Sequence, residues 1–120
     1  MKAKPSTVVL VVDDNQDLAE NIAEILSLHG YETVIADSAE DALPKALPEG
    51  PDLLITDFRL PGISGAELVR QIRERRKGVR AVVISAYTDD KTVAAARSAG
   101  AHFLPKPVDF SALSRILATA

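Results

Sequence analysis

The stretch LLITDFRLPGISG (residues 53–65) places an acid at the end of an apolar run. Leu53 to Thr56 are apolar or β-branched, which predicts a buried strand. The run ends at Asp57, shortly before a Pro-Gly turn. Burial disfavours the charged form of a carboxyl group, so an acid at this point does not help stability. The rest of the chain has to supply a functional reason for Asp57.

Five short apolar runs alternate with segments of helical periodicity. The expected strands cover residues 7–12, 31–36, 52–56, 81–85 and 102–105. The first three helices are expected over residues 15–29, 38–47 and 65–76, the third with a capping box of Ser64 and Glu67. The fourth begins at Asp89 or Asp90 and stops before Gly100, and the fifth runs from Asp109 or Ser111 through Leu117.

This alternation predicts an α/β fold, a doubly wound five-stranded parallel sheet with helices on both faces. The flavodoxin-like strand order 2-1-3-4-5 is the leading expectation. The second run alternates apolar and polar residues, as an edge strand does. Pro44 lies inside the second helical segment, so that helix is expected to be short, kinked or broken.

Composition limits the class of protein. The 120 residues suit one domain, expected over residues 1–120 with a core of about 6–118. A net charge of -3 argues against a nucleic-acid-binding surface spread over the domain. The chain has no cysteine, so it has neither disulfides nor thiolate metal sites. No apolar run approaches the ~18 residues that a membrane span needs.

Polar residues follow four of the expected strands. They are Asp13 and Asp14, Asp57, Ser85, and Lys106. Ligands of such sheets bind beyond the carboxyl ends of the strands, so all five side chains are expected at one rim.

Three neighbouring carboxylates repel one another and call for a cation, of which Lys106 supplies one charge. Oxygen ligands suit Mg²⁺ or Mn²⁺, and without His or Cys the cluster does not suit zinc.

Each residue also has a structural alternative. Asp13 and Asp14 can cap the first helix, Ser85 can simply end a strand, and Lys106 can be a surface residue of a turn. Stability alone, however, does not require five complementary residues at four adjacent strand ends.

The pieces VVDD (residues 11–14), TDFRLPGISG (56–65), ISAYTDD (84–90) and GAHFLPKPVD (100–109) occur in this order and spacing. Together they resemble the receiver domain of two-component response regulators, over essentially the whole chain from Thr7. The resemblance implies a phosphorylation-dependent switch in a cytoplasmic phosphorelay, rather than a metabolic enzyme. Its partners would be a histidine kinase or phosphotransfer protein and an output domain or downstream protein, with no direct nucleic-acid or membrane binding.

By this resemblance, Asp57 is the phosphoacceptor. Asp14 would bind Mg²⁺ directly and Asp13 through water, with Asp57 and the backbone carbonyl of Arg59 completing the protein ligands. Lys106 would pair with one phosphoryl oxygen. Phosphoryl transfer depends mostly on positioning and charge neutralisation, which agrees with this set of residues.

The resemblance also implies a switch. Ser85 would move toward the phosphoryl group, and the aromatic Phe103 would change rotamer with it, although Phe103 also suits the core. The bond between Lys106 and Pro107 would be the cis peptide usual in the family.

The signalling surface would be helix 4, strand 5 and helix 5, which include Arg97, His102 and Arg115. His102 stands where one dimer-forming branch often has an acid, so a homodimer on activation is left open.

Two large residues depart from the commonest pattern. Arg59 lies two residues after Asp57, and Tyr87 lies two residues after Ser85. In the family these positions flank the phosphoryl group. Our hypothesis is that both side chains hinder the attacking water and prolong the phosphorylated state.

Other readings fit the residues less well. An aspartyl-phosphate phosphatase needs a second acid two residues after its nucleophile, where this chain has Arg59. A flavin-binding module needs a Ser/Thr/Gly-rich loop after the first strand, where the sequence reads DDNQD. A receiver-like domain that no longer takes phosphate would usually lack one of the five residues.

Overall fold

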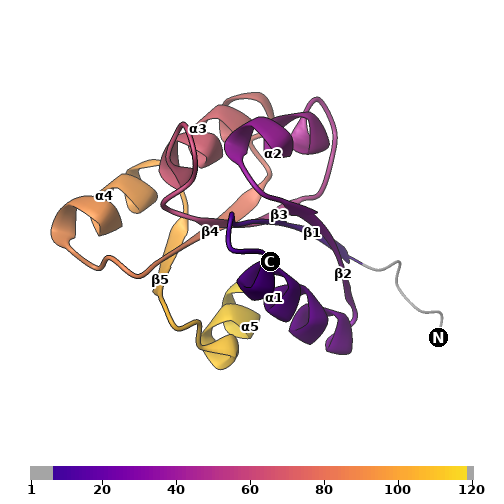
Figure 1. Ribbon diagram of the computed structural model, residues 1–120. Coiled ribbons are helices and arrows are strands. Elements are labelled where there is room, and N and C mark those ends of the chain that lie inside the picture. Colours follow the sequence, from indigo (N-terminus) through magenta and orange to yellow (C-terminus); the bar gives the residue numbers. More distant parts are fainter. Residues whose placement is uncertain (1–6, 119–120) are drawn as a thin grey trace.

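A computed structural model describes residues 7–118 of the chain. Five strands and five helices alternate along it (Figure 1). The strands are β1 (Thr7–Val12), β2 (Tyr31–Ala36), β3 (Leu53–Asp57), β4 (Arg80–Ser85) and β5 (His102–Pro105). The helices are α1 (Gln16–Leu28), α2 (Ala39–Ala46), α3 (Gly65–Arg75), α4 (Asp90–Ser98) and α5 (Phe110–Ala118). The outer limits of the expected domain fall on residues 1–6 and 119–120, which lie outside the described residues.

The strands form one parallel sheet in the order β2-β1-β3-β4-β5, which confirms the predicted topology. β2 lies at an edge, as its alternating pattern indicated, and β3 is the central strand, buried at every residue. Asp57 belongs to β3, although the strand was expected to end at Thr56. It pairs in register with Ile84, and the next amide, that of Phe58, donates to the carbonyl of Ile84 at 2.8 Å.

Two apolar clusters cover the two faces of the sheet. One side carries α2, α3 and α4, and the other carries α1 and α5 (Figure 1). Alternate residues of the central strands point to opposite faces, so Val83 belongs to the first cluster while Val82 and Ile84 belong to the second. With both faces covered, only the ends of the strands are open to solvent, and this directs attention to the edges of the sheet.

Four of the described helices, α2 to α5, begin at an expected capping residue. Asp89 rather than Asp90 caps α4, and Asp109 rather than Ser111 accepts the first amides of α5. Ser64 caps α3 by accepting the amide of Glu67 at 3.1 Å.

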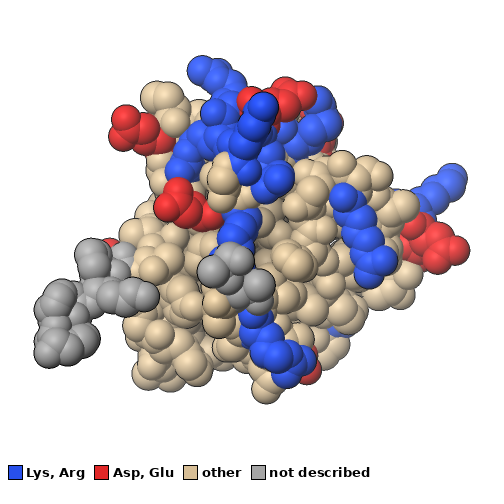
Figure 2. Space-filling model, turned by 180° about the vertical axis from the view of Figure 1, so that it is seen from behind, with Lys and Arg blue, Asp and Glu red and all other residues tan. Residues whose placement is uncertain are grey.

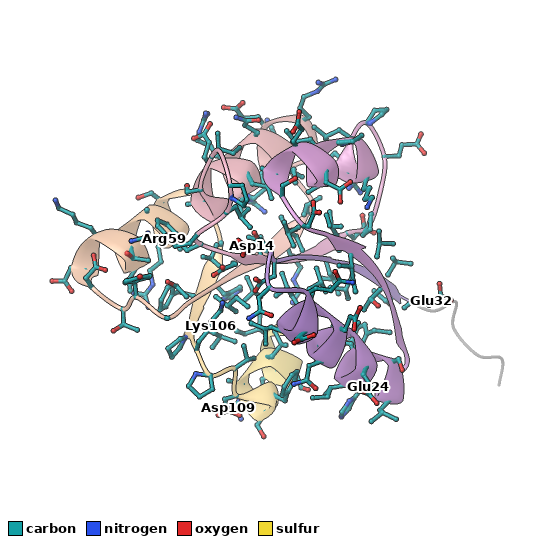
Figure 3. All side chains as sticks on the ribbon, in the orientation of Figure 1. Asp14, Glu24, Glu32, Arg59, Lys106 and Asp109 are labelled. Carbon is teal, nitrogen blue, oxygen red and sulfur yellow. The ribbon has the colours of Figure 1, made fainter. Side chains whose placement is uncertain are left out.

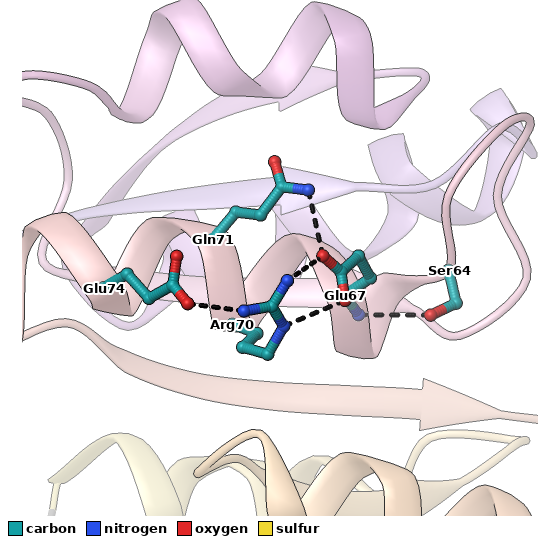
Figure 4. A network of polar contacts seen from close by, with 5 residues as sticks. All are labelled: Ser64, Glu67, Arg70, Gln71 and Glu74. Carbon is teal, nitrogen blue, oxygen red and sulfur yellow. Dashed lines mark hydrogen bonds and ion pairs between the residues drawn. The ribbon is translucent and has the colours of Figure 1, made fainter.

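The predicted capping box on α3 is only half formed. The Glu67 carboxylate accepts hydrogen bonds from the side chains of Arg70 and Gln71, and not from the backbone amide of Ser64 (Figure 4). The hydrogen bond from Arg70 lowers the pKa of Glu67 to about 2. The start of α3, which follows the loop after Asp57, is thus held by Ser64 and by an ion-pair network along the helix.

α2 is short, as Pro44 led us to expect, but it is continuous across the proline. Ser38 caps its first turn, and Ala39, Ala42 and Ala46 bury one face against the sheet. Among residues 7–118, no helix has the length and apolar character needed to cross a membrane.

Candidate functional site: an acidic cluster at the carboxyl edge

The five polar residues expected at one rim lie at the carboxyl ends of β1, β3, β4 and β5, either as the last residue of the strand or just after it. Figure 3 labels Asp14, Arg59 and Lys106, which follow three of these strands and lie toward the same part of the molecule. The parallel sheet brings them together because its strands all end at this edge.

Asp13, Asp14 and Asp57 form a cluster in which one carboxylate oxygen from each lies within 4.8 Å of the others. Asp13 and Asp57 are buried, with 1% and 6% of their surface exposed, while Asp14 is exposed. Asn15, not either aspartate, caps α1 through its side chain, so capping does not explain Asp14. Helix capping therefore does not explain why Asp13 and Asp14 stand at this position.

The Asp13 carboxylate is only half satisfied. Its Oδ1 accepts the Asn15 amide at 2.9 Å, whereas its buried Oδ2 has no hydrogen-bond partner among residues 7–118. Lys106 Nζ lies 3.5 Å from that Oδ2, which is long for a hydrogen bond. A buried carboxylate oxygen that accepts no hydrogen bond calls for a further partner, and a cation in the cluster would supply one.

Lys106 stands between the two buried acids, with Nζ also 3.3 Å from Asp57 Oδ1. It is half-buried, and the peptide bond from Lys106 to Pro107 is cis, as predicted. A second cis bond, between Leu47 and Pro48, was not predicted. Lys106 is therefore a member of the site and not a free surface lysine.

Burial raises the pKa of Asp57, and the nearby charge of Asp13 raises it further. Lys106 and the backbone amide of Arg59 act in the opposite direction but do not cancel these effects. One lysine thus leaves the cluster with excess negative charge.

The residues fit a divalent metal ion. They offer hard oxygen donors within one cluster, a buried oxygen on Asp13 that accepts no hydrogen bond, and uncompensated negative charge. The acids are arranged so that a small cation such as Mg²⁺ or Mn²⁺ could take one or two carboxylates and keep several waters.

Ser85 ends β4 as a buried residue, and its Oγ accepts the backbone amide of Tyr87 at 2.9 Å. The Tyr87 ring, half exposed, lies under the guanidinium of Arg59, whose Cζ is 4.3 Å from the ring centroid. This cation–π contact joins the loop after β3 to the loop after β4. The two residues singled out in the sequence therefore touch each other beside the site.

The predicted switch residue is partly buried, whereas the residues named on the predicted signalling surface are exposed. Phe103 is half-buried on β5, opposite Val83, and packs against the cluster that includes α3 and α4. Arg97, His102 and Arg115 are exposed on α4, β5 and α5.

Sequence reasoning missed Gly65. A Cβ there would lie 2.1 Å from the backbone oxygen of Asp57, and the Gly65 amide donates to the Phe58 carbonyl at 2.8 Å. Only glycine lets α3 start this close to the end of β3. The glycine after the capping serine was a visible signal, but the contact itself depends on the folded chain.

Comparisons with known proteins place the chain in a family. A family model described as response regulator receiver domain matches residues 9–118. A response regulator receiver protein of Anaeromyxobacter sp. (strain Fw109-5) is 47% identical over 109 residues, which cover 90% of this chain and 44% of that protein. The chain thus spans less than half of that relative.

Solved structures show the same architecture. A CheY-like response regulator receiver domain protein from Methanospirillum hungatei JF-1 aligns with a TM-score of 0.88 and 28% identity, covering 94% of this chain and 91% of that one. A response regulator protein from Burkholderia pseudomallei was solved with a phosphorylated aspartic acid, a calcium ion and citrate. It aligns with a TM-score of 0.86 and 28% identity, covering 95% of this chain and 68% of that one.

Proposed function

Because the chain belongs to the response regulator receiver domain family, we propose that it is a phosphorylation-dependent switch whose acceptor is Asp57. The observation that carries this proposal is the buried Asp57 carboxylate, which Lys106 contacts while Asp13 and Asp14 crowd it with further negative charge. Stability does not account for such a cluster, whereas phosphoryl transfer uses every member of it.

In the proposed reaction, an oxygen of the Asp57 carboxylate attacks the phosphorus of a phosphohistidine on a kinase or phosphotransfer protein. The new P–O bond forms as the P–N bond breaks, and the electron pair leaves with the imidazole, so the product is an acyl phosphate. Lys106 pairs with a phosphoryl oxygen and neutralises part of its charge. Asp13, Asp14, Asp57 and the Arg59 carbonyl would hold Mg²⁺, which, when bound, supplies the charge neutralisation that one lysine cannot.

The added group carries about -1.5 to -2 charges and three acceptor oxygens. We propose that the Ser85 hydroxyl donates to one of them and leaves its present contact with the Tyr87 amide. Phe103 would follow, altering the surface of α4, β5 and α5 read by an output domain or downstream protein. The proposal includes a cytoplasmic location, and no catalytic turnover beyond the chain's own phosphorylation and dephosphorylation.

The test uses acetyl phosphate and phosphoramidate, each with and without Mg²⁺, and reads intact mass. Wild type is expected to gain one phosphoryl group only with Mg²⁺, and Asp57→Asn none. Asp37→Asn is the matched control, because Asp37 also follows a strand at this edge but lies outside the cluster. A gain in Asp57→Asn equal to wild type would overturn the assignment of the acceptor, and no gain from any donor would leave a binding module that does not switch.

A further inference from the structure

The proposed site leaves unexplained a basic segment, RERRKGVR (residues 73–80), with five cations and one acid. It spans the end of α3 and the start of β4, at the edge of the sheet opposite the acidic cluster. Seen from behind, Lys and Arg side chains gather toward the upper part of the molecule, where α3 lies (Figure 2). In a chain of net charge -3, this local excess needs a reason.

Three arginines of the basic segment donate hydrogen bonds to backbone carbonyls. Arg73 donates to the carbonyl of Val79. Arg76 donates to the Pro51 carbonyl at 2.9 Å and to the Asp52 carboxylate at 2.7 Å. Because these two arginines already donate to groups within the domain, we expect them to bind an external anion only weakly.

Arg80 differs, because it joins a strand of the site to a helix end. Its guanidinium donates to the carbonyl of Ile116 and, at 3.4 Å, to the carbonyl of Leu117. Both carbonyls belong to the last three described residues of α5. Arg80 therefore ties the start of β4 to this part of α5.

Arg80 is also the first residue of β4, the strand that ends at Ser85. Between them, Val82 and Ile84 point to the face covered by α5 and share an apolar cluster with Leu113 and Leu117 of that helix. β4 and α5 thus contribute side chains to the same apolar cluster.

The other end of α5 is tied to the site as well. Asp109 Oδ1 accepts the Ser111 amide at 2.9 Å and the Ala112 amide at 3.4 Å. Asp109 follows Lys106 by three residues. The first turn of α5 and its residues 116–117 are therefore each held by a segment that also carries a residue of the proposed phosphoryl site.

We propose that Arg80 is a positioning residue that couples β4 to the last turn of α5. This rests on the proposed function: when Ser85 turns to the phosphoryl group, β4 is displaced, and Arg80 carries that displacement to the Ile116 and Leu117 carbonyls. The end of α5 then changes its protection with the phosphorylation state.

The planar fork of arginine suits this role, because it presents several donors to two carbonyls at once, whereas lysine offers one compact charge. Arg80 and Leu117 line an open pocket of about 740 Å³, so water can reach the Leu117 carbonyl when the fork is removed. Arg80→Lys is therefore expected to keep the charge and the fold while it weakens the hydrogen bonds to the Ile116 and Leu117 carbonyls.

The test is hydrogen–deuterium exchange of the α5 peptides, before and after phosphorylation with acetyl phosphate and Mg²⁺, with the phosphoryl group counted by intact mass. In wild type, the last turn of α5 is expected to change its exchange rate on phosphorylation by about threefold or more. In Arg80→Lys this response is expected to disappear while phosphorylation proceeds. Lys77→Ala is the matched control, because Lys77 is exposed in the same segment and has no partner among residues 7–118, and it should respond like wild type.

Three outcomes would overturn the coupling. If Arg80→Lys speeds exchange equally in both states and keeps the response, Arg80 is a static cap. If wild type gains the phosphoryl group and α5 does not respond, no signal passes along β4. If wild type gains no phosphoryl group by mass, the proposed function fails first, and the coupling falls with it.

Discussion

Asp57 occupies a place that costs stability and that a phosphoacceptor needs. Its carboxyl group is buried at the end of the central strand, close to Asp13, and both factors raise its pKa. Burial removes the water that would otherwise compete for the carboxylate oxygens, and the crowding of acids provides for a cation. The same features that make the residue reactive make its charge unfavourable in the metal-free protein.

Replacing Asp57 by Asn should therefore stabilise the metal-free protein at neutral pH, by about 1 kcal/mol. Because the pKa of Asp57 is raised on folding, the native state holds this proton to higher pH than the unfolded chain does. Wild-type stability should then fall as pH rises from the ordinary value of 3.8 through the raised pKa, and the penalty is complete above it. Urea unfolding of both proteins in chelator, over a pH series, measures the difference.

The difference between the two proteins should shrink at low pH, where Asp57 is protonated. Asp37→Asn removes an exposed acid at the same edge and should not show this pattern. A constant offset between wild type and Asp57→Asn at every pH would mean that packing, and not the charge of Asp57, sets its effect on stability.

The Arg59–Tyr87 contact provides a residue-scale test of phosphoryl lifetime. The contact holds the two side chains together beside the site. A barrier to water attack raised by about 0.5–1 kcal/mol corresponds to dephosphorylation that is about two- to fivefold slower. We expect the corresponding acceleration in the double variant Arg59→Ala, Tyr87→Ala, measured as loss of the phosphoryl group by intact mass after the donor is removed.

Tyr87→Phe is the control for that measurement, because it keeps the ring under Arg59 and should keep most of the lifetime. An unaltered dephosphorylation rate in the double variant would contradict the hypothesis that the two side chains hinder the attacking water.

Among the elements, α3 is the one that the site constrains most closely. Its first residue, Gly65, has no room for a Cβ, which would sit 2.1 Å from the Asp57 backbone oxygen. Gly65→Ala must move either the start of α3 or the end of β3, and we expect it to cost roughly 2–4 kcal/mol and to slow phosphorylation of Asp57. Urea unfolding and the mass assay measure the two effects.

The chain supplies a matched control in Gly78. A Cβ at Gly78 meets no atom within 4 Å, so Gly78→Ala should be neutral or slightly stabilising and leave phosphorylation unchanged. Equal tolerance of both substitutions would mean that α3 does not depend on its close approach to Asp57.

The second helix tests how far tertiary packing overrides local preference. Pro44 cannot donate the amide that an interior helical residue provides to the fourth residue before it, yet α2 continues through it. The Ser38 cap and the burial of Ala39, Ala42 and Ala46 offset that loss. Pro44→Ala should therefore raise the free energy of unfolding by about 1–2 kcal/mol, seen as a higher urea midpoint; no rise would show that α2 is already strained elsewhere.

At the scale of the whole molecule, the repeating pattern of the sequence determined most of what could be predicted. Period-two and period-3.6 patterns set the order of elements, and the handedness of βαβ crossovers left few topologies, so the sheet order and the rim of Asp13, Asp14, Asp57, Ser85 and Lys106 followed. Contacts between loops, such as that of Arg59 with Tyr87, have no periodic signal. The hydrogen bonds from Arg80 to α5 have none either, because they join residues that are 36 and 37 positions apart in the sequence.

The whole fold should also respond to a divalent ion, because the cluster draws its acids from β3 and from the turn that follows β1. An ion that binds only the folded state stabilises all of it, by about 2.7 kcal/mol at a concentration near one hundred times its Kd. We expect Mg²⁺ to raise the thermal midpoint of wild type at neutral pH, and the rise to fade in acid as Asp57 takes up its proton.

Asp14→Asn provides the decisive comparison for that prediction. Asp14 is exposed, so its loss should leave the fold intact while it removes an oxygen charge from the cluster. Most of the Mg²⁺ effect should disappear in Asp14→Asn and persist in Asp37→Asn. If instead both variants respond to Mg²⁺ as wild type does, the ion stabilises the protein from elsewhere, and the buried oxygen of Asp13 that accepts no hydrogen bond would need another explanation.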